Sequence, residues 1–133
     1  MVLMNSFRFY SFQFINSFVS LINKNDFKMT EQLKHYQNKL SFEIDPSDLF
    51  DAIEKGENVI PLDARKPFGF EAEHIPNAIN IPHREMSEET TKHLDKNALY
   101  VTYCDGIGCN ASTKGALNMT KLGFKSKRTN GWN

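Results

Sequence analysis

The chain has 133 residues, a mean hydropathy of −0.49 and a charged fraction of 24%, a composition typical of one soluble domain. Sixteen basic residues balance sixteen acidic ones, so no overall positive field attracts phosphate backbones or an anionic membrane, and we expect neither as a partner. No apolar run reaches the roughly 18 to 20 residues that span a bilayer. The two cysteines, Cys104 and Cys109, are too few for a disulfide framework, which favours a cytoplasmic protein with free thiols.

Residues 1–28 differ in composition from the rest of the chain. They hold six of the eleven Phe residues, many Asn and Ser, no Gly or Pro, and a single acid, Asp26. A secretory signal peptide would need a basic front and a small-residue cleavage site, and an organelle presequence would need repeated Arg. Two interpretations remain: translation begins at Met29, or the segment is a poorly packed extension. We therefore assign residues 29–133 to a single domain.

From residue 40 onward, segments typical of strands and of helices alternate along the chain. This alternation predicts an α/β domain with a mainly parallel central sheet flanked by helices on both faces. Asp45 and Pro46 favour the start of a helix, because Asp can cap the first amides and Pro suits the first helical position. Gly56 predicts the end of that helix.

Residues 59–62 form a short apolar run before Asp63, which predicts a buried strand with a polar residue at its carboxyl end. Pro61 weakens this prediction, because proline removes a ladder hydrogen bond. Residues 67–74 predict a short helix, and residues 78–81 predict a second brief strand.

The clearest strand is residues 99–103, which places Cys104 at its tip. Before it, Ser87 predicts the cap of a helix through Leu94. After it come a glycine-containing loop, residues 105–110, and another helical stretch. Ligands bind at the carboxyl edge of open α/β sheets, and amides of the loop and helix start can converge on an anion there. This unit therefore predicts a stabilised thiolate at Cys104.

Three blocks of the chain resemble the rhodanese-like (sulfurtransferase) domain family, over about residues 42–124. The first, residues 59–65, is similar to the family's apolar strand followed by Asp-x-Arg. The second, residues 70–82, resembles the family's aromatic-x-x-Gly-His-Ile-Pro-Gly-Ala-x-Asn-x-Pro signature, and the third, beginning at Tyr100, resembles the active-site strand, loop and helix. The resemblance implies a rhodanese-like fold shortened at the carboxyl end, since the last strand is nearly all polar and no closing helix follows.

The resemblance also implies a sulfurtransferase, in which a cysteine takes up a sulfane sulfur as a persulfide and passes it to cyanide or a thiol. We expect Cys104 to be this nucleophile. The loop expected to hold the persulfide comprises Asp105, Gly106, Ile107, Gly108, Cys109 and Asn110. Asp63 and Arg65 are interpreted as architectural residues that tie the first strand to neighbouring loops, and by resemblance His74 fixes its own turn. The expected partners are a small sulfane-sulfur donor and a thiol acceptor, for a monomer without cofactor or metal.

Several residues depart from the family pattern and leave alternatives open. The loop has no Arg, and Asp105 would repel both an incoming dianion and the thiolate, so we expect weak thiosulfate:cyanide activity. Lys114 is the nearest cation in sequence. Cys109 is either a second sulfur-handling thiol or an incidental cysteine. The alternative functions are a non-catalytic binding or regulatory module and a cysteine phosphatase, although residues 105–113 lack the Arg that would neutralise a phosphoryl group.

Overall fold

A computed structural model describes the backbone of residues 2–132 and the side chains of residues 12–132. The chain divides into two compact units, Met1–Lys39 and Leu40–Asn133. The boundary predicted after residue 28 falls inside a helix that begins in the first unit.

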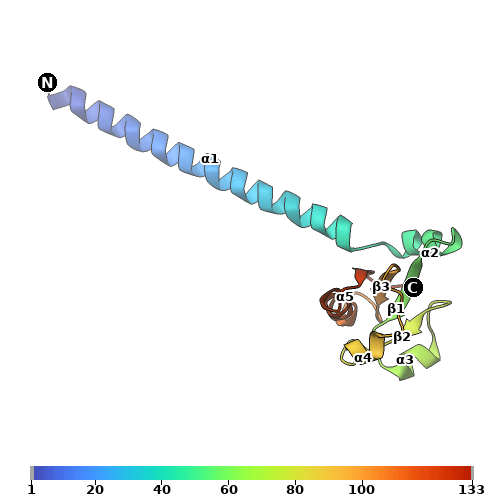
Figure 1. Cartoon of the computed structure of the whole chain (residues 1–133). Helices are drawn as coiled ribbons and strands as arrows, with labels where there is room; N and C mark the ends of the chain where they lie inside the picture. Colours follow the sequence, from blue (N-terminus) through green and yellow to red (C-terminus); the bar gives the residue numbers. More distant parts are fainter. Residues whose placement is uncertain (1, 133) are drawn as a thin grey trace. The chain divides into compact units, whose positions relative to one another are not determined.

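That helix, α1 (Val2–Phe42), runs without interruption along the blue to green part of the chain (Figure 1). The sequence predicted no regular element here, but the chain contains no Gly or Pro before Pro46, so nothing breaks a helix once it has formed. Large apolar side chains along α1 are exposed, including Phe14 at 79% and Leu40 at 80%. Among the residues that the structure describes, no helix is both long and apolar enough to cross a membrane.

A four-stranded sheet forms the centre of the second unit. Its strands are β1 (Val59–Asp63), β2 (Ile79–Asn80), β3 (Leu99–Tyr103) and β4 (Lys125–Arg128). They lie in the order β2-β1-β3-β4, and every neighbouring pair is parallel. Asp63 lies opposite both Asn80 and Tyr103, so the carboxyl ends of three strands meet at one edge. This arrangement confirms the predicted parallel sheet.

Four short helices accompany the sheet. They are α2 (Pro46–Glu54), α3 (Pro67–Ala72), α4 (Glu88–Thr91) and α5 (Ala111–Lys121). The predicted capping bond of Asp45 is wrong, since this residue holds the N-cap position of α2 without a side-chain bond to the helix. Ser87 does cap α4, in a capping box with Thr90. Helix α4 ends before Leu94, whose amide donates to the Thr91 carbonyl and closes a tighter turn.

Helices cover both faces of the sheet. Thr102 and Tyr103 are neighbours on β3, so their side chains point to opposite faces. The Thr102 hydroxyl donates to the carbonyl of Ser112 in α5 at 2.8 Å. The Tyr103 ring packs edge-on to Trp132 at a centroid distance of 5.9 Å, and Trp132 lines an apolar pocket with Leu49 of α2. Helices α5 and α2 therefore lie on opposite faces, as predicted.

The main core lies between the sheet and α5. Its buried members are Leu62, Ile81, Ala98, Tyr100, Met119 and Phe124. Tyr100 and Phe124 meet edge to face with centroids 5.4 Å apart, a favoured geometry for aromatic pairs. Gly115 lets α5 approach the sheet closely, because a Cβ there would lie 3.1 Å from the Cβ of Ala64 and 3.3 Å from Cγ2 of Thr102. The helix that follows the Cys104 loop is thus held firmly against the strand that precedes it.

Pro61 fits within β1 because of the side to which its nitrogen points. The Asp63 carbonyl accepts the Ile81 amide on the β2 side, and residues two apart in a strand address the same neighbour. Pro61 therefore faces the β2 side as well. There β2 pairs only with Leu62 and Asp63, so the missing N–H leaves no described ladder bond unmade.

Strand β4 forms at the sheet edge although its sequence, Lys-Ser-Lys-Arg, is polar. An edge strand tolerates such residues because one side stays in contact with water. Glu43 forms an isolated parallel bridge with Arg128 on that side, and the Ile44 amide donates to the Arg128 carbonyl at 3.0 Å. The segment before α2 thus shields part of this edge.

Candidate active site

Cys104 directly follows β3, at the edge where the carboxyl ends of the strands meet. The Ala64 amide donates to the Tyr103 carbonyl at 3.1 Å, so strand pairing continues up to the cysteine. The side chain packs between Ala64 and Ala111, and only 2% of the residue is exposed. The nucleophile predicted from sequence is therefore a buried thiol between β1, β3 and α5.

Hydrogen bonds surround the Cys104 sulfur. Its thiol donates to the Cys109 carbonyl at 3.2 Å and has a longer contact of 4.0 Å with the Gly106 carbonyl. Burial raises the pKa of Cys104. Hydrogen bonding by Ser112, the Cys109 side chain and the Gly106 backbone lowers it by more than burial raises it, so the pKa lies below that of an ordinary thiol. The site thus favours the nucleophilic thiolate.

The loop contributes fewer amides to this sulfur than the sequence suggests. The Cys109 amide donates to the Gly106 carbonyl at 3.1 Å, and the Ala111 amide points to the Cys109 sulfur at 3.5 Å. Of the described loop residues, only Gly106 and Cys109 bond to the Cys104 sulfur. Asp105 instead pairs with Arg65, and 95% of Ile107 is exposed; no bond to this sulfur is described for the remaining predicted loop residues, Gly108 and Asn110.

Arg65 joins the two strand ends that flank the site. Its Nε lies 3.0 and 3.1 Å from the two carboxylate oxygens of Asp63, and one terminal nitrogen lies 2.6 Å from Asp63 Oδ2. The other terminal nitrogen donates to Asp105 at 2.9 Å. The Arg65 backbone amide also donates to Asp63, at 2.9 Å. These carboxylates raise the pKa of Arg65, so the guanidinium is a permanent charge beside the loop.

This contact changes the expectation for Asp105. The sequence suggests that its carboxylate repels an anion, with Lys114 as the nearest cation. In the fold, Arg65 compensates Asp105 from 40 positions earlier in the chain, and 70% of the Asp105 side chain is exposed to water. Its repulsion of an anion in the site is correspondingly reduced.

Aromatic rings and the signature turn hold Arg65 in place. The guanidinium carbon lies 5.7 Å from the Tyr103 ring centre and 5.6 Å from that of Trp132. A terminal nitrogen donates to the Glu73 carbonyl at 2.7 Å. The next residue, His74, has its Nδ1 2.7 Å from the Phe70 carbonyl and its ring stacked on Phe70. His74 thus bonds within its own turn, the supporting role that the family resemblance implies for it.

A cleft of about 490 Å³ opens beside the loop, and Cys109 is the thiol that lines it. Its basic lining residues are Arg65, Lys66, His83 and Arg84. Phe68, with 84% of its surface exposed, forms an apolar part of the wall. The described thiol at the cleft surface is therefore Cys109, with Cys104 buried behind it.

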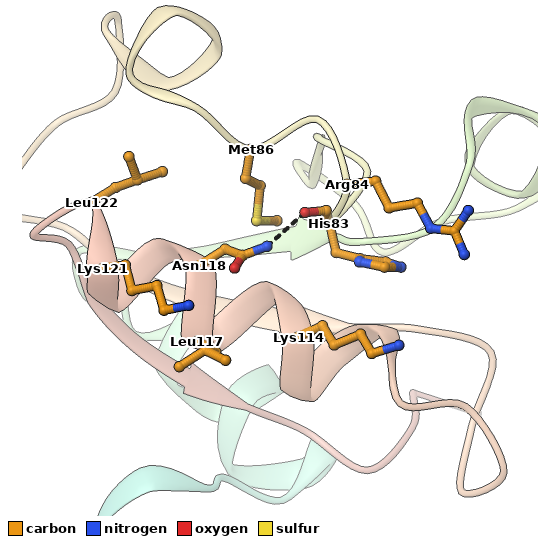
Figure 2. Close-up of a pocket in the computed structure, with 8 residues that line it drawn as sticks. All are labelled: His83, Arg84, Met86, Lys114, Leu117, Asn118, Lys121 and Leu122. Carbon is orange, nitrogen blue, oxygen red and sulfur yellow. Dashed lines mark hydrogen bonds between the residues drawn. The ribbon is translucent and has the colours of Figure 1, made fainter.

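A second cleft, of similar size, lies on the outer side of α5 (Figure 2). Asn118 of α5 points toward the segment that carries His83 and Arg84, and its amide donates to the His83 carbonyl at 2.7 Å, whereas the Lys114 and Lys121 side chains extend along the helix. Burial lowers the pKa of His83, and the charges of Lys114 and Arg84 lower it further. Lys114 thus belongs to this outer cleft and does not bond to the Cys104 sulfur.

Two residues of the site were not predicted from the sequence. Ser112, with 2% of its surface exposed, lowers the pKa of Cys104 through both its side chain and its backbone. Its position in the first turn after the loop, where helix amides point at anions, was an available signal. Trp132 covers Arg65, but it lies among polar residues near the chain end, and no periodic pattern identified it.

Comparison with known proteins places these features in a family. The family model for the rhodanese-like domain matches residues 45–130. The structure of a protein from Bacillus halodurans is similar at 42% identity and a TM-score of 0.72, over 77% of this chain and 79% of that chain. A rhodanese-related protein from Thermoplasma volcanium is 28% identical with a TM-score of 0.58, over 68% of this chain and 89% of that one.

A rhodanese-like domain protein from Staphylococcus aureus, 22% identical over 69% of this chain and 91% of that chain, shares the fold with a TM-score of 0.61. No curated protein matches the chain. The family model covers more than half of the residues and includes β1, the turn of His74 and the Cys104 loop. The chain therefore belongs to the rhodanese-like domain family.

Proposed function

We propose that the protein is a sulfurtransferase that carries a sulfane sulfur on Cys104. The observation that supports this most directly is the hydrogen bonding of the Cys104 sulfur, which lowers the pKa of the thiol despite its burial. A thiolate is the form that attacks a disulfide or sulfane sulfur. Membership of the rhodanese-like family supports the same assignment.

The reaction has two displacements. The Cys104 thiolate attacks the sulfane sulfur of a donor such as thiosulfate, the sulfur–sulfur bond of the donor breaks, and sulfite leaves with the electron pair. The persulfide that results carries its charge on the outer sulfur. A thiolate or cyanide acceptor then attacks this outer sulfur, and Cys104 leaves as the thiolate. Ser112 and the Gly106 backbone lower the pKa of Cys104, so they favour the charged sulfur before and after the cycle.

Donor access requires the loop to open, since 2% of Cys104 is exposed. The loop is built for such movement: 95% of Ile107 is exposed, and a Cβ placed at Gly106 or Gly108 would contact nothing within 4 Å. The neighbouring cleft is lined by Lys66 and Arg84, which attract a small anionic donor, and also by Glu85 and by Asp105, which Arg65 compensates. We propose that donor and thiol acceptor enter from this side.

Mass spectrometry of the intact protein tests the proposal. After incubation with thiosulfate and removal of the excess, the Cys109→Ser variant should gain the mass of one sulfur atom, which cyanide should remove as thiocyanate. The matched Cys104→Ser variant should gain nothing. The Cys109→Ser background is used because a second thiol can discharge the adduct. Absence of any adduct in Cys109→Ser, alongside a reactive rhodanese as positive control, would contradict the proposal.

The burial of Cys104 supports a second candidate, a non-catalytic binding or regulatory module. In that case the Cys104 thiol keeps its hydrogen bond to the Cys109 carbonyl and serves only to pack the loop. The rate of alkylation separates the two functions. A persulfide-forming Cys104 should react with iodoacetamide at neutral pH faster than a free cysteine, whereas a packed thiol should react more slowly.

A further inference from the structure

Cys109 is a second thiol in direct contact with the proposed nucleophile. Its backbone carbonyl accepts from the Cys104 thiol at 3.2 Å, and its own sulfur receives the Ala111 amide at 3.5 Å. It packs against the small buried cluster that holds Cys104. Both cysteines are free thiols. The site therefore contains a dithiol pair, with one sulfur buried and the other at the cleft.

The position of Cys109 determines which sulfur it can attack. Cys109 packs against the cluster of Cys104, and the Cys104 atom that residue 109 contacts is Sγ, which becomes the inner sulfur once a persulfide has formed. Attack on an inner sulfur gives a disulfide, whereas attack on the outer sulfur would give a second persulfide. The Cys109 carbonyl lies 3.2 Å from the same Sγ, so the backbone also holds residue 109 against it.

We propose that Cys109 is a resolving thiol that discharges the Cys104 persulfide as hydrosulfide. This inference rests on the proposed function. The Cys109 thiolate attacks Cys104 Sγ, a Cys104–Cys109 disulfide forms, and the bond to the outer sulfur breaks. The outer sulfur leaves with the electron pair and takes up the proton lost by Cys109. The sulfane sulfur is reduced to sulfide while the two cysteines are oxidised, and an external dithiol reductant restores them.

The ionisation of the two cysteines determines the order in which they react. Burial raises the pKa of Cys109, and the neighbouring Cys104 raises it further, whereas the pKa of Cys104 is lowered, so Cys104 ionises before Cys109. Loading with sulfur moves the negative charge from Cys104 Sγ to the outer sulfur. The acceptor that stabilised the Cys109 proton is then gone, and the thiol can ionise. Cys109 therefore becomes reactive only after Cys104 has taken up the sulfur.

The experiment follows a single turnover without added thiol. Wild type and Cys109→Ser are treated with thiosulfate and desalted, and sulfide and intact mass are followed with time. Cys109→Ala serves as a second variant, and circular dichroism verifies that both are folded. Wild type should release stoichiometric sulfide and end with the loss of two hydrogens, with Cys104 and Cys109 linked in peptide mapping. Both variants should keep the added sulfur and release none.

Two results would overturn the inference. One is a sulfur adduct in wild type that persists as long as in Cys109→Ser; the other is an adduct that peptide mapping finds on Cys109, which would mean attack on the outer sulfur. Failure of the proposed function looks different, because then neither variant gains sulfur at all. A dithiol reductant added at the end should return the disulfide form of wild type to its starting mass.

Discussion

Replacement of Arg65 by Met should be the most damaging single change near the site. Arg65→Met keeps the length and apolar stem of the side chain but removes the guanidinium. The Asp63 carboxylate is fully buried and would keep the backbone amide of residue 65, at 2.9 Å, but no positive charge beside it. Removal of one member of a buried ion pair costs about 3–5 kcal/mol, because the other charge is left without compensation.

The other bonds of Arg65 add less to this loss. Asp105 has 70% of its side chain in water, so its ion pair is worth about 0.2–1 kcal/mol. The Glu73 carbonyl belongs to an exposed residue and can bind water instead. Small domains have total stabilities of about 5–15 kcal/mol. The buried Asp63 end therefore dominates, and Arg65→Met should lose a large fraction of the stability of the domain.

Urea unfolding followed by circular dichroism would measure this loss in four variants: Arg65→Met, Asp63→Asn, Asp105→Asn and the double variant Asp63→Asn/Arg65→Met. Arg65→Met should lose about 3–5 kcal/mol, Asp105→Asn about 1 kcal/mol or less, and the double variant Asp63→Asn/Arg65→Met less than the sum of its single changes. If Arg65→Met loses no more than Asp105→Asn, the buried ion pair does not stabilise this edge of the sheet and the reasoning fails.

Three further outcomes follow from the packing and chemistry of the site. Gly115→Val should lower stability by about 1–3 kcal/mol in the same unfolding assay, because its Cβ would meet the Ala64 Cβ at 3.1 Å; an unchanged midpoint would mean that α5 shifts freely. In wild type, alkylation of Cys104 should follow the thiolate, so its rate should fall as the pH drops, with a midpoint below that of a free cysteine; a midpoint above it would contradict the hydrogen-bonding argument. Ser112→Ala should move this midpoint to higher pH and slow the reaction at neutral pH, with little change at alkaline pH, and an unmoved profile would exclude the Ser112 contribution.

The local features of the sheet could be predicted from sequence. Strand β3 is a short run of β-branched and aromatic residues, and turn-forming residues on either side mark its ends. That is why the position of Cys104 at a strand tip follows from the sequence alone. Helix α1 could not be predicted from periodicity, since its apolar residues fall all around the helix. The absence of Gly and Pro was the signal that remained.

The contacts that define the site were beyond sequence reasoning. Arg65 meets Asp105 across 40 positions, and only the register of β1 against β3 places the two together. The loop hydrogen bonds were equally inaccessible, because whether Cys109 presents its amide or its carbonyl to Cys104 depends on backbone angles such as the φ of 143° at Gly106. The residue types were enough to identify which residues take part in the site, whereas their hydrogen-bond and ion-pair partners depend on the tertiary structure.

The orientation of Pro61 also hinders the addition of strands from other molecules to the edge of this sheet. Beyond the two residues of β2, the amino-terminal half of β1 has no described strand on that side. An incoming chain would need a donor there to extend the ladder, and proline has none. At the opposite border, the cationic side chains of β4 repel a second copy of the same strand. Replacement of Pro61 by Val would therefore keep the fold while making intermolecular strand addition, and with it fibril formation, easier.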